Sequence, residues 1–349
     1  MWLEPTPTEL PPLRVVVPAR NEAEHIEACI EALIQLGGHQ TTISIMDDDS
    51  SDTTLAISRR MAVGHPRVQV RSVPPRPDGW AGKSWAVWNG QPGAEAWLLF
   101  VDADVRLRPD LASTLIAEAE RHELALLSAF GTWELPTPGT RWLVPAFGWL
   151  IRGLVDRRQV EDGRMAFANG QVMLVRRSAY EACGGHESIR ASVLDDVHLA
   201  RAVQRSGGRV SVRWAPWGFR VLPYASASQV VRGYRKNMAA GLDGRRGLAI
   251  FGVVAIVWLY LAPLCLGALG VWLAEPILAV AGLVGVALVV GMRLRTDHAD
   301  GRLTWLAWLH PIAGAVLAYT LWRSMFGGPA AWKGRRFVDG VASPEADST

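Results

Sequence analysis

The chain has 349 residues and a formal net charge of +3, a length that suits one large domain or two. Its three cysteines, Cys29, Cys183 and Cys265, lie far apart, which excludes a disulfide scaffold and a cysteine-based metal site and predicts a reduced interior. The N-terminal segment "MWLEPTPTELPPL" has no basic stretch followed by an apolar run, so it is not expected to be a secretory signal.

The first 130 residues alternate predicted strands and helices. Buried-strand patterns end at proline, aspartate or glycine, and helical spacing of apolar residues follows them. We expect strands at 13–18, 42–47, 67–73, 96–103 and 124–130, and helices at 26–34, 50–62 and 109–121. This alternation predicts an α/β domain with a mostly parallel sheet. Because no secretory signal is expected, we expect this part of the chain to fold in the cytoplasm.

The pattern changes from Thr140 to Val155, where Trp, Phe and Leu dominate and no clean periodic face is visible. This segment is either a core helix pair or a segment lying in the membrane interface. Three apolar runs follow at 248–274, 277–292 and 303–322, and runs of about 20 apolar residues are typical of transmembrane helices.

These runs predict a membrane domain at 241–326, after a cytoplasmic domain at 1–240 and before a tail at 327–349. Basic residues before the first run and in the loop "RLRTDHADGR" favour a cytoplasmic location for both. The tail "WKGRRF" is also basic, although three full spans would place it outside. The number of spans and the side of the C-terminus therefore stay open, and the expected location is a bacterial-type inner membrane.

Polar clusters fall at the carboxyl ends of the predicted strands, where ligands of parallel sheets bind. The clearest is "DAD", with Asp102 and Asp104 two residues apart and able to converge on one ligand. Hard carboxylate oxygens suit magnesium or manganese, which would bridge the acids to a diphosphate leaving group. The tripeptide alone is equally compatible with two solvated loop acids.

Three further clusters carry candidate chemistry. In "MDDDSSD", Ser50, Ser51 or Asp52 suits a helix cap, while Asp48 is a candidate to accept hydrogen bonds from a base or a ribose. In "GWAGKSWAVWNG", Lys83 suits a phosphate, although an exposed loop lysine is the simpler interpretation of that motif alone. In "SVLDDVHLARAV", acids in a first helical turn are common, but one of them is a candidate general base.

In their order along the chain, "PARNE", "DDDSSD", the "GK" loop, "DAD", "NGQ" and "LDD" resemble the family 2 glycosyltransferases. The resemblance covers about Leu13 to Pro223. It implies a GT-A nucleotide-diphospho-sugar transferase fold and an inverting transfer from a nucleotide sugar. A divalent cation, magnesium or manganese, is the implied cofactor.

The resemblance also implies roles for individual residues. Positions around the donor match the family's nucleotide-sugar pocket, namely Pro18, Ala19, Arg20, Glu22, Asp48, Lys83 and Asp102. Asp104 matches the metal ligand, and Asn169 and Gly170 match the strand that borders the sugar and the acceptor. Asp195 and Asp196 match the family's Glu-Asp pair, with Asp196 as the catalytic base. Asp195 stands where the family has Glu.

Within the family, "GWAGKSWA" and "RRSAYEACGGHESIRASVLDDVHLARAV" look most like membrane-bound enzymes that act on carotenoids and hopanoid-type lipids. Processive synthases carry Gln-x-x-Arg-Trp, and here Gln229 and Arg232 are followed by Gly233, which counts against a synthase. Arg232, with Arg235 and Lys236, suits either lipid phosphates or a plain positive-inside flank. The predicted reaction moves one sugar, glucose from UDP-glucose, to a membrane lipid, with no nucleic-acid partner.

Other functions remain open from the sequence. The acceptor could be a polyprenyl phosphate, a ceramide-like lipid or a cell-surface glycan, and a carboxylate acceptor would not need Asp196 as a base. A nucleotidyltransferase also uses an α/β sheet with acidic metal ligands, but it releases pyrophosphate. A non-enzymatic membrane component with a vestigial nucleotide site predicts that Asp196→Asn leaves cellular function intact.

Overall fold

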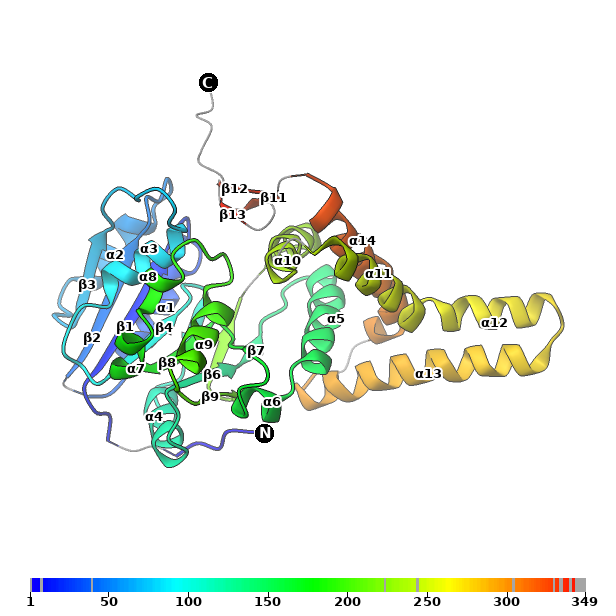
Figure 1. Ribbon diagram of the computed structural model, residues 1–349, viewed down its shortest axis with the longest axis horizontal. Helices are drawn as coiled ribbons and strands as arrows, with labels where there is room; N and C mark the ends of the chain where they lie inside the picture. The colour runs from blue at the N-terminus through cyan, green and yellow to red at the C-terminus, as the bar shows by residue number, and fades with distance from the viewer. Residues whose placement is uncertain are drawn as a thin grey trace, which may run out of the picture. The chain divides into compact units, whose positions relative to one another are not determined.

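We describe the protein from a computed structural model (Figure 1). It describes residues 2–6, 9–38, 40–222, 224–242, 245–302 and 305–328, together with the backbone of strands at 330–332, 335–338 and 341–342. The chain forms two compact units, residues 1–134 with 155–223, and residues 135–154 with 224–349. We describe each unit by itself.

The first unit is built on a seven-stranded sheet with the order β3-β2-β1-β4-β8-β6-β9. Every neighbouring pair is parallel except the two that involve β8. The strands are β1 (Leu13–Ala19), β2 (Thr41–Asp47), β3 (Val68–Ser72), β4 (Trp97–Val101), β6 (Leu126–Phe130), β8 (Val172–Arg176) and β9 (Val210–Trp214). The predicted α/β fold with a mostly parallel sheet is confirmed.

Helices cover both faces of this sheet, because its central strands are apolar on both sides (Figure 1). One face packs against α1 (Ile26–Ile34), α2 (Thr54–Ala62) and α4 (Leu111–Arg121). The other packs against α3 (Gly82–Gly90), α7 (Arg177–Ala182) and α9 (Asp195–Arg205). The short helices α6 (Arg157–Glu161) and α8 (Gly185–Ser188) complete the unit's helices in the described residues.

The helix predicted from Ser50 begins later, at Thr54. The acids and serines before it form a turn, in which Asp52 Oδ1 accepts the N–H of Thr54 at 2.9 Å. A second sheet of three short strands, β5 (Val105–Leu107), β10 (Phe219–Val221) and β7 (Thr132–Trp133), was not predicted. It joins the residues after "DAD" to the end of the unit, and the N–H of Leu222 donates to the carbonyl of Asp104 at 3.2 Å.

The second unit is helical, apart from three short strands near the end of the chain, β11 (Ala330–Trp332), β12 (Arg335–Val338) and β13 (Val341–Ala342). Its helices are α5 (Pro138–Leu154), α10 (Ala227–Gly241), α11 (Arg246–Tyr260), α12 (Ala262–Trp272), α13 (Pro276–Ala299) and α14 (His310–Phe326), with a 3₁₀ turn η1 at Trp305–Leu309. The segment at 140–155 belongs to one helix, which ends at Leu154, where the sequence left a helix pair or an interfacial segment open. The predicted run 303–322 and tail 327–349 lie partly outside the described residues.

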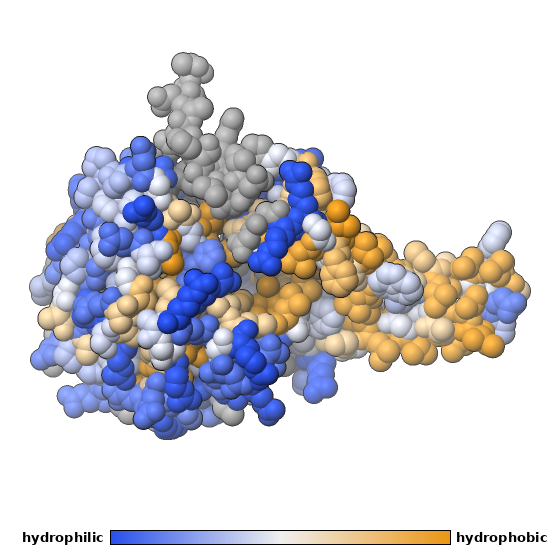
Figure 2. Space-filling view, viewed as in Figure 1, coloured by the Kyte–Doolittle hydropathy of each residue, from blue (hydrophilic) through white to orange (hydrophobic). Residues whose placement is uncertain are grey.

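The α12–α13 hairpin is apolar on its outside (Figure 2). Its exposed side chains include Trp272, Ile277, Leu283 and Leu288, all more than 60% accessible. Of the described helices, α13 alone is long and apolar enough to cross a membrane, over Pro276–His298. The predicted first run is two helices, α11 and α12, bent by 48°, and the pair counts as a second crossing only if it forms one bent span.

Arg293 of α13 replaces a backbone hydrogen bond that is missing in α5. Pro145 lies inside α5 and has no N–H, so the carbonyl of Arg141, four residues earlier, loses its helical donor. The fully buried guanidinium of Arg293 supplies that donor at 2.9 Å and also bonds the carbonyl of Trp142 at 3.2 Å. Asp297 accepts from Arg293 Nε at 2.8 Å, so the buried charge is paired.

Candidate active site

The carboxyl ends of β1, β2 and β4 meet at one edge of the sheet, because these strands are parallel neighbours. Pro18 and Ala19 end β1, and Asp47, paired with Ala19, ends β2. Asp102 follows the last residue of β4 at the same edge. Ligands of open parallel sheets bind beyond such ends, so this edge is the candidate donor site.

Arg20, Glu22 and Asp48 form the loops beyond β1 and β2. Asp48 is almost fully buried, and its N–H donates to the carbonyl of Ala19 at 2.8 Å. Arg20 Nη1 donates to the carbonyl of Asp48 at 2.6 Å, and the N–H of Glu22 donates to Thr54 Oγ1 at 2.8 Å. In this structure Arg20 therefore fixes the backbone that carries Asp48.

Lys83 connects this edge to the acids of α9. Its Nζ lies 2.9 Å from Asp102 Oδ1 and 3.3 Å from Asp195 Oδ2, and its side chain is 38% exposed. It occupies the second position of α3, after Gly82. One cation thus bridges a carboxylate at the end of β4 and a carboxylate in the first turn of α9, and its exposed part is open to a ligand.

Asp195 and Asp196 open α9 and point to different partners. Asp195 is buried and pairs with Lys83. Asp196 is half-buried, and its Oδ2 accepts the N–H of Gly170 at 2.9 Å while its Oδ1 accepts the N–H of Val197 at 2.8 Å. The structure therefore brings together five predicted site residues, Lys83, Asp102, Gly170, Asp195 and Asp196.

The two acids ionise differently. Burial, followed by the negative charge of Asp195, raises the pKa of Asp196 to about 6, and Lys83 offsets only part of this. For Asp195, burial is the largest effect and disfavours ionisation, but Lys83 and His186 together outweigh it and hold the pKa below the ordinary value. Burial also favours neutral Lys83, but the charges of Asp102, Asp195 and Asp196 hold its pKa above the ordinary value. Asp196 is therefore the acid with the properties of a general base near neutral pH.

Gly170 allows the close approach of Asp196 and Lys83. A Cβ at this position would lie 3.0 Å from Asp196 Oδ2 and 3.3 Å from Lys83 Nζ. Asn169 beside it donates through Nδ2 to the carbonyl of Ala129 at 2.7 Å and to Gln171 Oε1 at 3.1 Å. Its amide nitrogen holds the loop in place, so an acceptor-side role for Asn169 stays a prediction.

This chain matches the family model "Glycosyltransferase like family 2" over residues 11–232. The chain belongs to glycosyltransferase family 2. The match covers the whole seven-stranded sheet together with Lys83, Asp102, Asp104, Asp195 and Asp196. The resemblance to family 2 glycosyltransferases inferred from the motifs is confirmed.

Several curated proteins are similar to this chain. The 4,4′-diaponeurosporenoate glycosyltransferase of Staphylococcus aureus strain bovine RF122 / ET3-1 is 28% identical over 261 residues, which cover 71% of this chain and 66% of that protein. The protein of the same name from strain USA300 is 29% identical over 263 residues, with the same coverage. The chain thus spans slightly less than two thirds of the length of these relatives.

Among solved structures, a mannosyltransferase from Pyrobaculum calidifontis, PcManGT, in complex with GDP-Man and Mn²⁺, is similar in fold. Its TM-score is 0.56 at 16% identity, and the match covers 94% of this chain and 91% of that one. At this identity the likeness supports the GT-A fold alone.

The residues after β4 suit a divalent cation. Asp104 and Asp102 offer hard carboxylate oxygens, and their negative field reaches Cys29, where burial and then the charges of Asp104, Glu22 and Asp102 raise the thiol pKa. Among the described residues, no three His, Cys, Asp or Glu side chains form a metal site by themselves.

Gln229 and Arg232 lie on α10, in the second unit. The N–H of Gln229 donates to Ser226 Oγ at 3.4 Å, and its Oε1 accepts the N–H of Ala225 at 2.7 Å. Ser226 thus caps α10, and the side chain of Gln229 holds the residue before the cap. Arg232 is exposed, and the acceptor-side roles of both residues stay predictions.

His186 and Tyr180 adjoin the site and were not among the predicted residues. His186 is fully buried on α8, with its Nε2 3.9 Å from Asp195 Oδ2 and its Nδ1 2.9 Å from the hydroxyl of Tyr180. The signal was the "GGH" triplet, because Gly184 and Gly185 both adopt positive φ and a Cβ at Gly185 would lie 2.5 Å from the ring of Tyr180.

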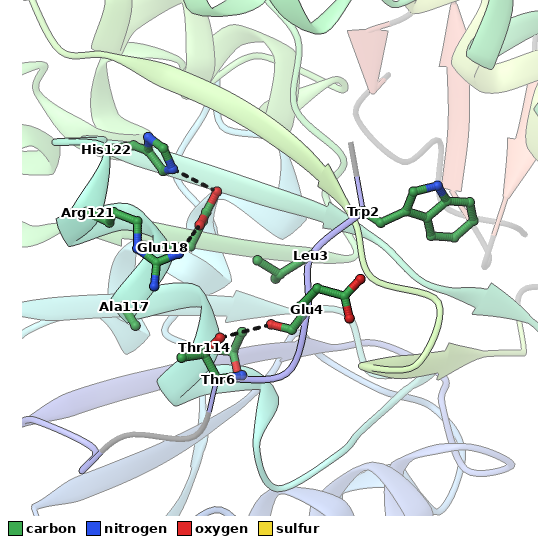
Figure 3. Close-up of a pocket in the computed structure, with 9 residues that line it drawn as sticks. All are labelled: Trp2, Leu3, Glu4, Thr6, Thr114, Ala117, Glu118, Arg121 and His122. Atoms are coloured by element: carbon green, nitrogen blue, oxygen red, sulfur yellow. Dashed lines mark hydrogen bonds and ion pairs between the residues drawn. The ribbon is translucent and has the colours of Figure 1, made fainter.

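A pocket on the first unit lies away from these residues (Figure 3). The N-terminal segment Trp2–Thr6 covers α4 there, and the N–H of Thr6 donates to Thr114 Oγ1 at 3.1 Å. Glu118 faces Arg121 at 3.9 Å and His122 at 3.4 Å on the same helix (Figure 3). None of the predicted site residues lines this pocket.

Proposed function

We propose that this glycosyltransferase transfers a single sugar, glucose from UDP-glucose, to a membrane lipid of the carotenoid or hopanoid type, with inversion. The observation that carries the proposal is a cluster of charged side chains. Lys83 contacts both Asp102 and Asp195, and the neighbouring Asp196 accepts the N–H of Gly170. It combines a cation for a leaving diphosphate with a carboxylate suited to accept a proton.

In the proposed reaction, the acceptor oxygen forms a bond to the anomeric carbon while the bond from that carbon to the diphosphate oxygen breaks. The hydroxyl proton passes to Asp196, and the bonding electrons leave with UDP. Lys83 stabilises the departing diphosphate, and Asp48 and Asp102 orient the nucleoside. Asp104 would hold a divalent cation, magnesium or manganese, which supplies further charge neutralisation when bound.

The lipid acceptor is supported by two observations. The S. aureus relatives are named for a carotenoid-type acid as their acceptor. The α12–α13 hairpin exposes large apolar side chains, which are unfavourable in water and stable in a bilayer. We therefore propose a cytoplasmic catalytic domain at 1–240, a multi-pass membrane domain at 241–326 and a tail at 327–349, in a bacterial-type inner membrane.

The acceptor group is proposed to be a hydroxyl. The name "diaponeurosporenoate" denotes a carboxylate, which is already ionised and gives a glycosyl ester. A hydroxyl must lose a proton, and Asp196, with its pKa raised to about 6, is suited to take it. A carboxylate acceptor gives a glycosyl ester, and a hydroxyl acceptor gives a glycoside. Mild alkali distinguishes them, because it cleaves the ester and leaves the glycoside intact.

The test is lipid profiling of a strain that lacks the gene, with radiolabelled UDP-glucose added to membranes that contain the full chain. We expect a labelled, alkali-stable lipid, loss of this lipid in the deletion strain, and release of UDP. Release of pyrophosphate would indicate a nucleotidyltransferase instead. An unchanged lipid profile would reject a lipid acceptor, and an alkali-labile product would reject the hydroxyl.

A further inference from the structure

His186 is a buried histidine with one ring nitrogen still available. Its Nε2 has no hydrogen-bond partner among the described residues, although it lies 3.9 Å from Asp195 Oδ2. A buried polar group without a partner is destabilising, and such groups persist where they have a function. The available nitrogen faces the carboxylate that neighbours the proposed base.

Tyr180 determines which nitrogen of His186 carries the proton. The hydroxyl oxygen of Tyr180 accepts the backbone N–H of His186 at 3.1 Å and lies 2.9 Å from His186 Nδ1. The backbone N–H is a donor, so Nδ1 is the acceptor that the described residues offer to the buried hydroxyl hydrogen, and in that arrangement Nδ1 carries no proton. Burial lowers the pKa of His186, so the ring is neutral and its one proton resides on Nε2, facing Asp195.

Asp195 then has two possible partners on the same oxygen. Lys83 Nζ lies 3.3 Å from Asp195 Oδ2, and His186 Nε2 lies 3.9 Å from it. Lys83 is also the residue proposed to meet the diphosphate of the donor. When Lys83 turns to the diphosphate, Asp195 is left as a buried carboxylate whose nearest remaining donor is the Nε2–H of His186.

We propose that His186 is a positioning residue, whose Nε2–H takes over Asp195 when Lys83 engages the donor diphosphate. This inference rests on the proposed function. The exchange keeps Asp195 ionised and fixed during the reaction. The negative charge of Asp195 in turn keeps Asp196 basic enough to accept the acceptor's proton.

Several charged and titratable groups surround Asp195 and Asp196, and they influence how these two acids ionise with pH. Lys83 on α3 and Asp102 after β4 face them from one side, and His186 on α8 faces them from the other. On its other side His186 contacts Tyr180, whose pKa is raised most by burial and, less strongly, is raised by Cys183 and lowered by Arg177. Of these groups, His186 is the one that presents to Asp195 a ring nitrogen, Nε2, without a hydrogen-bond partner among the described residues.

The first experiment compares His186→Leu, His186→Gln and Tyr180→Phe in the full chain, with His65→Gln as a control at an exposed histidine. Activity is measured with UDP-glucose and a hydroxylated carotenoid in phosphatidylglycerol vesicles. We expect His186→Leu to lower kcat about tenfold with little change in the donor KM, and to move the acidic limb of kcat to lower pH. The amide of His186→Gln should restore most of the activity, and Tyr180→Phe should show a smaller loss.

Equal losses in the Leu and Gln variants, without a shift of the pH profile, would show a purely structural role and overturn the proposal. The second experiment does not require turnover. Nitrogen NMR of protein labelled at histidine should show the Nε2–H tautomer of His186, with its proton signal moving downfield when UDP and magnesium are added. An Nδ1–H tautomer, or no response to UDP, would overturn the proposal even if the wild type transfers sugar. If the wild type transfers no sugar but the tautomer and the UDP response are observed, the proposed function fails and the exchange at Asp195 stands.

Discussion

Gly170 donates its N–H to Asp196 Oδ2 at 2.9 Å, and a methyl group on Gly170 would lie 3.0 Å from that same oxygen. The glycine therefore sets both the hydrogen bond and the clearance of the proposed base. It also lies next to Lys83, since the same methyl group would be 3.3 Å from Nζ.

The substitution Gly170→Ala should displace Asp196 by a few tenths of an ångström and lower kcat by about 10- to 100-fold, because small displacements of a catalytic group are costly. The matched control is Gly37→Ala, where a Cβ meets nothing within 4 Å and φ is not positive. Both variants are compared by thermal unfolding and by steady-state kinetics. Wild-type kcat in Gly170→Ala would mean that Asp196 does not act at this position.

The activity should fall in acid as Asp196 becomes protonated. Its pKa is raised to about 6, and only the ionised carboxylate accepts a proton, so kcat should be low below this pH and increase through it. The measurement is a pH profile of kcat at saturating donor. The variant Asp196→Asn should lose at least about 100-fold in kcat at every pH and keep UDP binding. If kcat of this variant still falls in acid as in the wild type, another group is responsible for that fall.

The arrangement of the donor edge was predictable from the sequence, because each strand there is a short apolar run that ends in a polar cluster. Lys83 and Asp195 are 112 positions apart, and both lie in the first turn of a helix. Only the family resemblance implied that they belong to one site. Local patterns could not reveal β5, β7 and β10, since two- and three-residue strands carry no periodicity.

His186 was missed for a related reason. A lone histidine carries little signal by itself, and the "GG" before it shows only that the backbone turns there, not that the turn brings His186 close to Asp195. The helix ends in the apolar half were also inaccurate. The break between α11 and α12 falls at Leu261, within an uninterrupted apolar run, where composition alone gives no boundary.

The two acids of "DAD" should respond differently to substitution. Asp102 pairs with Lys83 at 2.9 Å, whereas Asp104 is proposed to hold the cation. We therefore expect Asp104→Ala to abolish the dependence of UDP-glucose binding on magnesium or manganese, and Asp102→Ala to weaken binding while leaving that dependence in place. Titration calorimetry with and without each metal measures both, and an equal loss of metal dependence in the two variants would contradict separate roles.

Arg293 and Pro145 should be coupled energetically, although one lies on α13 and the other on α5. Arg293→Met leaves the carbonyl of Arg141 without a donor and Asp297 without its cation, and should lower the free energy of unfolding by about 3–5 kcal/mol. Pro145→Ala restores the helical N–H for the same carbonyl, so Arg293→Met should cost roughly 1 kcal/mol less in its presence.

This double-mutant cycle is measured by thermal or denaturant unfolding of the full chain in detergent. Asp297→Asn in the Arg293→Met background separates the loss of the ion pair from the loss of the carbonyl donor, because it removes the unpaired carboxylate without changing α5. If the two substitutions are additive, the guanidinium acts only as the partner of Asp297. A coupling of about 1 kcal/mol instead assigns Arg293 to the gap left by the proline.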